Sequence, residues 1–295
     1  MKVKPFFASC LFSFFLCLAF TSCDYNLQQF LYRDNSVEDR LTGLSASTLS
    51  GSSLPSPLNN TYKVAIITDV HFGAGERGTL DADFIAWANA HNMAFCICLG
   101  DVAEHGAEAE YKQYASFVTD VKAVLTTHKV YSTVGNHDLY SDGWKWWKKY
   151  VNTDFNLDTS FYTFTAGGFS WYFIDSASGT LGVSQFKALT ARMEEDSNPK
   201  IVLSHFPLYA DGAYNASYPT LQNSMETSRL IDLFARNNVK FFASGHSHHW
   251  AQKSFGSFYE VNFTGFNAKK SWGYIEVDAT SGQVIAYDKD GKRLL

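Results

Sequence analysis

The feature that most limits the fold of this chain is an alternation of apolar runs with segments of helical spacing. Near-continuous apolar runs, each short enough for one strand, occupy 62–71, 94–101 and 129–138. Between them, 80–92 and 108–126 repeat apolar residues every three or four positions, which is typical of amphipathic helices. Parallel strands joined by helices are covered on both faces and therefore lose the polar alternation of a half-exposed strand. This half of the chain predicts a largely parallel sheet.

The second half of the chain mixes helical repeats with strands that look antiparallel. Two strands are expected around the Ala-Gly-Gly turn at 166–168, and the final strands have the same character. The mixture predicts one α/β domain with a mixed, two-sheet core. In chain order the expected elements are two strands within 160–176, a helix over 184–196, a strand over 200–207, a helix over 225–238, and strands over 239–248, 257–265 and 273–288.

Asp, Asn and His residues stand at the ends of five expected strands. In open α/β sheets the carboxyl ends of the strands meet in one crevice, so these residues should converge although they are far apart in sequence. In the D-x-H and H-x-H segments, the one-residue gap lets both polar side chains face the same way from an extended backbone. The residues are Asp69 with His71, then Asp101, then Asn136 with His137 and Asp138, then His205, and finally His246 with His248.

This set of side chains suits two divalent metal ions. It offers carboxylate or amide oxygens and imidazole nitrogens with almost no thiolate, a combination that favours Mn, Fe or Zn. Seven such ligands are too many for one ion and suffice for two ions that share a carboxylate. Two ions a few ångströms apart are a common device for in-line displacement at phosphorus. The sequence therefore predicts a dinuclear centre that acts on a phosphate ester.

These motifs resemble those of the calcineurin-like metallophosphoesterase superfamily. D-x-H, G-D-x-x-E, G-N-H-D, a lone His after an apolar strand, and G-H-x-H follow one another in this order from Asp69 to His248. The resemblance implies the family's sandwich of two mixed β-sheets flanked by helices. For the metals it implies that Asp69, His71 and His248 bind the first ion, that Asn136, His205 and His246 bind the second, and that Asp101 bridges the two.

The same resemblance gives catalytic roles to two further residues. His137 matches the family's second-sphere histidine, which protonates the leaving oxygen or holds the substrate phosphate. In many relatives an Asp three residues after the bridging Asp orients that histidine, and here Glu104 is expected to serve with its longer side chain. Asp138 is expected to support the loop rather than to react, and Gly135 to permit its sharp turn.

The implied activity is metal-dependent hydrolysis of phosphate esters by a metal-bound hydroxide, with His137 at the leaving group. Glu104 stands where purple acid phosphatases have a Tyr, and the Arg of the serine/threonine protein phosphatase motif is absent. We therefore expect a phosphomonoesterase or phosphodiesterase of another kind. The alternatives are a non-catalytic surface lipoprotein that uses the fold as a binding module, and a nuclease. The formal charge of -5 gives nucleic acid no support as a partner.

The N-terminus has the character of an export signal. A short basic start precedes an apolar stretch from Pro5 to Phe20, which is too short and too interrupted by Ser and Cys for a comfortable membrane span. Small residues then lead to Cys23, a pattern that resembles the bacterial lipoprotein signal in which this Cys is lipidated. We expect a membrane-anchored lipoprotein, periplasmic or on the cell surface, with plain secretion and an uncleaved anchor as alternatives.

The chain accordingly divides into a signal at 1–23, a flexible Ser-, Asn- and Leu-rich tether at 24–60, and a phosphoesterase domain at 61–295. Cys96 and Cys98 alternate on one expected strand. Both should point to the same face as small core hydrophobes, while the residue between them points to the other.

Two segments are candidates for the rim of the site. In the helical segment after G-N-H-D, either Trp144, Lys145 and Lys148 grip the apolar and anionic parts of a substrate, or the segment is simply an amphipathic covering helix. A Tyr-rich stretch that begins at Tyr209 follows His205 directly and is expected to form another lip.

Overall fold

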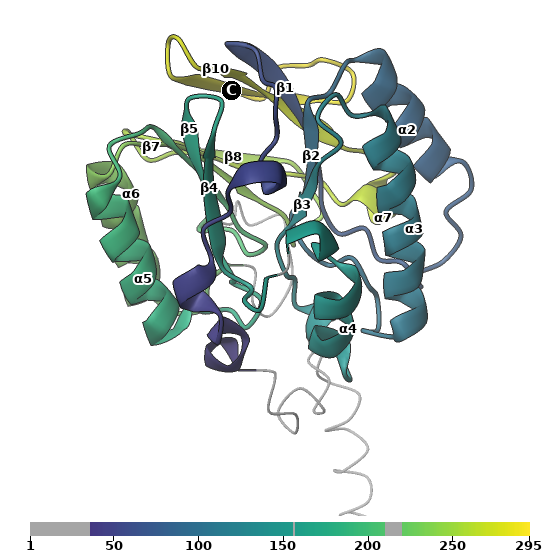
Figure 1. Ribbon diagram of the computed structural model, residues 1–295, viewed down its shortest axis with the longest axis horizontal. Coiled ribbons are helices and arrows are strands. Elements are labelled where there is room, and N and C mark those ends of the chain that lie inside the picture. The colour runs from purple at the N-terminus through teal and green to yellow at the C-terminus, as the bar shows by residue number, and fades with distance from the viewer. Residues whose placement is uncertain (1–35, 156, 210–219) are drawn as a thin grey trace, which may run out of the picture.

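The computed structural model describes residues 36–155, 157–209 and 220–295. Two β-sheets lie face to face, and helices cover the outer face of each (Figure 1). The predicted α/β sandwich of two mixed sheets flanked by helices is therefore confirmed. The predicted signal at 1–23, with Cys23, lies outside the described residues, as do the first part of the tether and most of the Tyr-rich stretch.

The first sheet is made of β1 (Thr61–Ile67), β2 (Phe95–Cys98), β3 (Val130–Ser132), β10 (Gly273–Asp278) and β11 (Gln283–Asp288). Its strand order is β11-β10-β1-β2-β3. β1, β2 and β3 are parallel, as the apolar runs predict, and β10 adds to β1 antiparallel. The helices on its outer side are α2 (Leu80–Ala90), α3 (Glu108–Val124) and α4 (Gly143–Tyr150), with the 3₁₀ turns η6 (His137–Leu139) and η7 (Thr153–Phe155) beside α4.

The second sheet is made of β4 (Tyr162–Ala166), β5 (Phe169–Phe173), β6 (Lys200–Leu203), β7 (Val239–Ser244), β8 (Ala251–Ser254) and β9 (Tyr259–Asn262). Its order is β4-β5-β6-β7-β9-β8, with parallel pairing from β5 to β9 and antiparallel strands at both edges. The helices α5 (Gly182–Glu195) and α6 (Ser224–Arg236) cover its outer face, and the short α7 (Phe266–Lys269) follows β9.

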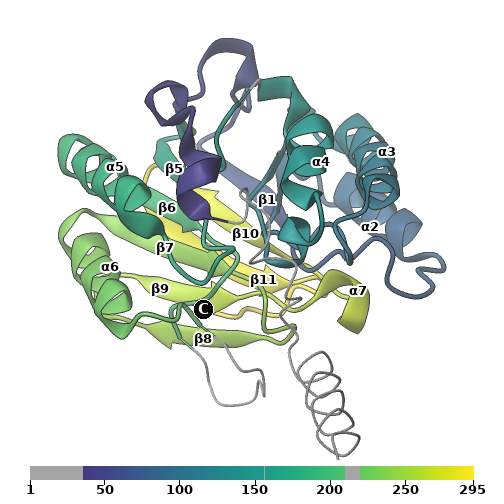
Figure 2. The same cartoon turned by 90° about the horizontal axis from the view of Figure 1, so that it is seen from below.

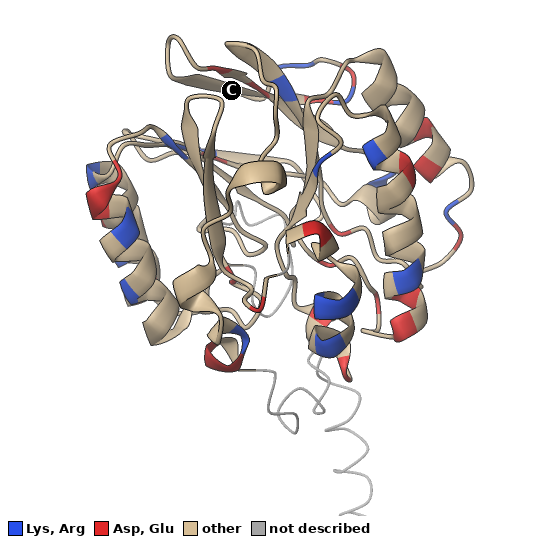
Figure 3. Ribbon diagram, viewed as in Figure 1, with Lys and Arg blue, Asp and Glu red and all other residues tan. Residues whose placement is uncertain are grey.

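Side-chain alternation along the strands divides the interior into layers. On β2, Ile97 packs between the two sheets, whereas Cys96 and Cys98 face the helices, as their spacing predicts. Both thiols are buried and free, and burial raises their pKa above the usual range. Lys and Arg are interspersed with Asp and Glu over the outer helices (Figure 3). None of the helices in the described part of the chain has the length and hydropathy that a membrane crossing needs.

Residues 36–60 do not form a tether, so that prediction is wrong for the described part of the segment. Three 3₁₀ helices, η3 (Val37–Leu41), η4 (Leu44–Ala46) and η5 (Gly51–Ser53), run along the domain, and η3 lies beside α5 (Figure 2). Arg40 is fully buried, and its Nε and Nη2 atoms lie 2.7 and 2.9 Å from the carboxylate of Asp175. A few buried apolar side chains and this ion pair hold a segment whose average composition looks unstructured.

Glu38 completes the attachment of this segment. Its Oε1 atom accepts hydrogen bonds from the backbone N–H groups of Val183 (2.7 Å) and Ser184 (3.0 Å), in the first turn of α5. These donors have no partner inside the helix, so an acidic side chain stabilises the helix end. The folded domain therefore begins by residue 36 rather than at residue 61.

Candidate metal centre

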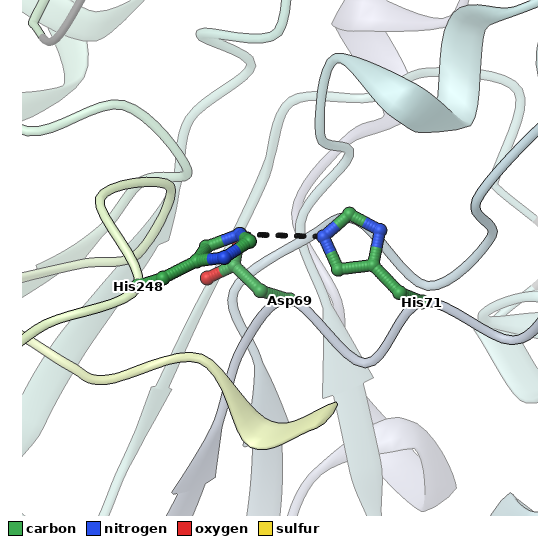
Figure 4. A group of neighbouring side chains, drawn as sticks. All are labelled: Asp69, His71 and His248. Atoms are coloured by element: carbon green, nitrogen blue, oxygen red, sulfur yellow. Dashed lines mark hydrogen bonds and ion pairs between the residues drawn. The ribbon is translucent and has the colours of Figure 1, made fainter. Parts of the chain in front are cut away.

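The three side chains expected at the first metal meet where β1 and β7 end. His248 Nε2 lies 3.1 Å from Asp69 Oδ1 and 3.4 Å from His71 Nε2 (Figure 4). One ligand atom from each residue lies within 4.8 Å of the other two. Asp69 and His71 are buried, and His248 is half-buried. The arrangement can hold one ion with protein on most sides.

The side chains expected at the second metal meet beside the first group. Asp101, His205 and His246 offer ligand atoms within 4.8 Å of one another. His205 Nε2 lies 3.3 Å from Asp101 Oδ2 and 3.0 Å from Asn136 Oδ1. These residues come from the ends of β2, β3, β6 and β7, which meet at one edge of the sandwich, as strand ends do in open α/β sheets.

Asp101 lies between the two groups. Its Oδ2 atom is 3.3 Å from His205 Nε2 and 3.8 Å from His71 Nε2. Its Oδ1 atom accepts a hydrogen bond from the backbone N–H of His137 at 2.8 Å. One oxygen of this carboxylate thus lies near a histidine of each group.

The backbone at these positions is unusual for residues with a side chain. Five of the expected ligands adopt a left-handed conformation, with φ between 47° and 69°. This region is sparsely populated by residues other than glycine, and such strain gathers at functional sites, where surrounding structure imposes it. Here residues in this conformation follow β1, β2 and β7, and their side chains meet at one edge of the sandwich. The five are Asp69, His71, Asp101, His246 and His248.

The hydrogen bonds around the ligands leave atoms that fit divalent cations. His205 Nδ1 donates to the carbonyl of Leu99 at 2.8 Å; because a carbonyl only accepts, Nδ1 carries a proton, and the neutral ring that binds a metal ion would have its lone pair on Nε2. Asp69 Oδ2 accepts from Thr68 Oγ1 and the His246 N–H, whereas its buried Oδ1 accepts no hydrogen bond. Imidazole nitrogens of neutral rings and a carboxylate oxygen that accepts no hydrogen bond form a donor set for ions of the Mn, Fe or Zn type.

The charges of the site act on one another strongly. Burial by itself lowers the pKa of His205, but the carboxylates of Asp101 and Asp69 outweigh it and raise this pKa to about 9. Burial would raise the pKa of Asp69, yet the histidines around it hold that pKa below its usual range. The centre therefore attracts positive charge.

Glu104 contacts different atoms from those expected. The Nδ1 atom of His137 donates to the backbone carbonyl of Glu104 at 2.8 Å, while the Glu104 carboxylate lies 3.9 Å from that nitrogen. Glu104 Oε2 instead lies 2.7 Å from Nδ1 of the expected ligand His71. The Glu104 carboxylate thus lies closer to His71 than to His137, and the expected orientation of His137 by this side chain stays a prediction.

Asp138 supports the loop that carries Asn136 and His137. Its Oδ1 atom accepts hydrogen bonds from the N–H groups of Val102 (2.9 Å) and Ala103 (3.0 Å), and its Oδ2 atom from Gly135 (2.9 Å). Gly135 is needed for space rather than for a turn, since its φ is not positive and a Cβ would overlap the backbone and carboxylate of Asp101. The scaffold role expected for Asp138 agrees with these contacts; the role expected for Gly135 does not.

Trp144 does not belong to a substrate rim. Its side chain is only 3% exposed, and its ring stacks on Trp147 with centroids 5.2 Å apart inside the core below α4. The prediction that Trp144 grips substrate is therefore wrong, and the alternative of an amphipathic covering helix is correct. Two apolar residues three positions apart simply mark the buried face of α4.

The other rim candidates have protein partners of their own. Lys145 Nζ lies 4.3 Å from the ring of Trp146, and Lys148 Nζ lies 3.7 Å from a carboxylate oxygen of Asp158. Tyr209 is half-buried, and the Nζ atom of Lys253 lies 4.8 Å from its ring. Their expected contact with substrate stays a prediction.

Two positioning residues were missed by the sequence analysis. The ring of Phe206 stacks on His246 with centroids 4.0 Å apart, and its place directly after His205 was an available signal. Arg77 donates from Nη1 to the carbonyl of Val70 at 2.7 Å, within the D-x-H segment. Arg77 lies in a Gly-rich loop without a recognisable pattern, so nothing in the sequence marks it.

Comparison with known families settles the membership of the chain. The family model described as calcineurin-like phosphoesterase matches residues 62–250. The chain belongs to this family. That span includes both groups of ligands in this phosphoesterase. The family and the intact dimetal ligand set confirm the predicted enzyme class, a metallophosphoesterase that hydrolyses phosphate esters at a dimetal centre.

Solved structures show the same fold for this phosphoesterase. A dimetal phosphatase from Danio rerio has a TM-score of 0.56 at 14% identity, over 77% of this chain and 95% of that one. GAP50, described as the anchor in the inner membrane complex of Plasmodium, gives 0.54 at 15%, over 80% and 87%. A purple acid phosphatase from Lupinus luteus gives 0.53 at 14%, over 79% of this chain and 54% of that one. No curated protein matches the sequence.

Proposed function

We propose that this phosphoesterase is an exported phosphomonoesterase or phosphodiesterase with two adjacent ion sites, and that Asp101 is a ligand in both. Asp69, His71 and His248 would hold the first ion, and Asn136, His205 and His246 the second. The observation that carries this proposal is the place of Asp101, whose carboxylate contacts His71 of the first group and His205 of the second.

The ions would supply the chemistry that the side chains lack. Two divalent ions of the Mn, Fe or Zn type neutralise charge on phosphoryl oxygens and lower the pKa of water. His137 would supply the proton for the leaving oxygen: because its Nδ1 donates to the Glu104 carbonyl, its Nε2 is the atom left for the substrate. Asp101 fixes the His137 backbone through its Oδ1 atom, so the bridging ligand and the acid are held together.

The test of this function is metal analysis combined with two classes of substrate. We expect the purified full chain to bind two equivalents of metal and to hydrolyse 4-nitrophenyl phosphate or bis(4-nitrophenyl) phosphate. A chelator should abolish turnover, and Mn²⁺, Fe²⁺ or Zn²⁺ should restore it. The ester that is hydrolysed faster decides between a monoesterase and a diesterase. Two bound equivalents with no turnover on a broad panel of phosphate esters would instead support a binding module.

Export and a lipid anchor at Cys23 are supported by the sequence of residues 1–23, with its basic start, apolar stretch and small residues before the Cys. In cells supplied with labelled palmitate, we expect the protein to take up label and to sediment with membranes. A Cys23→Ala variant should do neither. Equal labelling and equal partition of the two proteins would contradict the anchor without affecting the proposed chemistry.

A further inference from the structure

Glu104 contacts two histidines of the site through two different groups. Its carboxylate Oε2 lies 2.7 Å from Nδ1 of His71 and 3.9 Å from Nδ1 of His137. Its backbone carbonyl accepts the hydrogen bond from His137 Nδ1 at 2.8 Å. The carboxylate of this residue is therefore closest to His71, while its main-chain carbonyl is the hydrogen-bond partner of His137.

The main chain of Glu104 is held independently of its side chain. Beyond the ends of β1 and β2 the two segments stay hydrogen-bonded, with His71 N–H donating to Asp101 O and Phe72 N–H to Val102 O, each at 2.9 Å, and Phe72 forms a parallel bridge with Ala103. The N–H of Glu104 then donates to Phe72 O at 2.9 Å. A substitution of the side chain therefore leaves the carbonyl in place against His137.

We propose that the Glu104 side chain is a positioning residue for His71, and that only the Glu104 main chain positions His137. The inference rests on the proposed function, because it takes His71 as a metal ligand through Nε2. A carboxylate beside the far nitrogen of a ligating histidine fixes the ring and its tautomer and increases the basicity of the ligand. The carboxylate thus supports metal binding rather than protonation of the leaving group.

The second group of ligands offers an internal comparison. There His205 Nδ1 donates to the backbone carbonyl of Leu99, which no side-chain substitution removes. Loss of the Glu104 carboxylate should therefore weaken the binding of the first ion and leave the binding of the second unchanged. Because the Glu104 side chain is 28% exposed, its truncation leaves no closed cavity and the variants should fold.

The first experiment measures Mn²⁺ binding to the metal-free full chain by calorimetric titration. His248→Ala and His246→Ala identify which binding step belongs to which group. We expect Glu104→Ala to lower the Mn²⁺ affinity of the binding step that His248→Ala affects by about 10–100-fold, the usual cost of losing such a partner. The affinity of the other step should stay unchanged. Glu104→Gln should lose less, because its amide oxygen can still lie beside His71 Nδ1, although without the negative charge.

The matched control is Glu76→Ala, which removes an exposed carboxylate five residues after His71. It should leave both binding steps as they are in the wild type. Unchanged affinity at both steps in Glu104→Ala would overturn the inference, as would equal weakening of the two steps.

The second experiment separates the two histidines at saturating Mn²⁺. It compares aryl phosphate esters that release 4-nitrophenolate, a good leaving group, with esters that release phenolate, a poor one. His137→Ala should lose far more activity on the phenyl ester, whereas Glu104→Ala should show the same fold-change on both. A selective loss on the phenyl ester in Glu104→Ala would overturn the inference. A wild-type protein without metal binding or hydrolysis would contradict the proposed function instead.

Discussion

Asp138 Oδ1 accepts a hydrogen bond from the backbone N–H of Val102 at 2.9 Å. This contact joins the loop after β3, which carries Asn136 and His137, to the loop after β2, which carries Asp101. The G-D and G-N-H-D motifs are therefore one structural unit, and Asp138 holds its two halves at a fixed distance.

Replacing Asp138 by Asn should loosen this unit. An amide offers one acceptor where the carboxylate offers two, and its NH₂ group would face a backbone N–H. A buried donor left without an acceptor costs about 1–3 kcal/mol, so the free energy of unfolding should fall by that amount in urea denaturation. Asp142→Asn, an exposed change next to α4, is the control. Equal stability of the two variants would show that Asp138 is not a scaffold.

The buried pair of Arg40 and Asp175 should make the N-terminal segment essential to the domain. Removing one partner leaves an uncompensated buried charge, so Arg40→Ala should lower the free energy of unfolding by about 3–5 kcal/mol. Arg236→Ala, which breaks an exposed pair with Asp232 on α6, should change it little. If Arg40→Ala were as mild as Arg236→Ala, residues 36–60 would be a tether after all.

Trp144→Ala should affect stability rather than substrate binding. Truncation of a buried Trp leaves a cavity and costs about 3–5 kcal/mol, which thermal or urea denaturation would detect. Where the variant remains folded, its KM should equal that of the wild type. Trp146→Ala, on the partly exposed side of the same helix, should cost less stability. A stable Trp144→Ala variant with a raised KM would restore the substrate-rim interpretation.

Glu260 should make stability fall as the pH rises. Burial raises the pKa of this carboxyl to about 8, although the N–H of Leu208 and the hydroxyl of Ser244 donate to it. Because the folded-state pKa lies above the unfolded value, the folded protein binds the extra proton between about pH 4.5 and pH 8. The contribution of Glu260 is thus fully present below that range and is lost as the pH rises through about 8.

The Glu260→Gln variant has no titratable group at this position and therefore tests the pH dependence of stability. Its free energy of unfolding relative to the wild type should increase with pH, by at most about 1.4 kcal/mol per pH unit between the two pKa values. Urea denaturation at a series of pH values measures the difference. A constant difference across the series would show that Glu260 titrates alike in the folded and unfolded chains.

The fold was predictable wherever burial leaves a clear pattern. The strands β1, β2 and β3 were located correctly because both their faces are covered, which produces continuous apolar runs. β8 was missed, because this edge strand, Ala251–Ser254, is largely exposed and carries no apolar run. Residues 36–60 were misread for the opposite reason: a few buried contacts, above all that of Arg40, outweigh a composition typical of a linker.

The site was predictable as a set of residues but not as a set of contacts. Asp69, Asp101 and His205 could be grouped because parallel strand ends must meet, whatever the distance in sequence. The partner of Glu104 could not be foreseen, because it depends on where the main chain of the loop lies and on the length of one side chain. The sequence indicates which groups are present, and the structure decides which of them touch.

Asp101 is the ligand that both metal sites would share, so Asp101→Asn should affect both ions at once. We predict that this variant binds both ions more weakly. Loss of a side chain that only supports a metal ligand usually costs about 10–100-fold in affinity or activity. Asp101→Asn should lose more of its aryl phosphate hydrolysis than that. Asp120→Asn, an exposed change on α3, should match the wild type in both measurements. An Asp101→Asn protein that keeps two tightly bound ions and most of its hydrolysis would show that Asp101 is not a shared ligand.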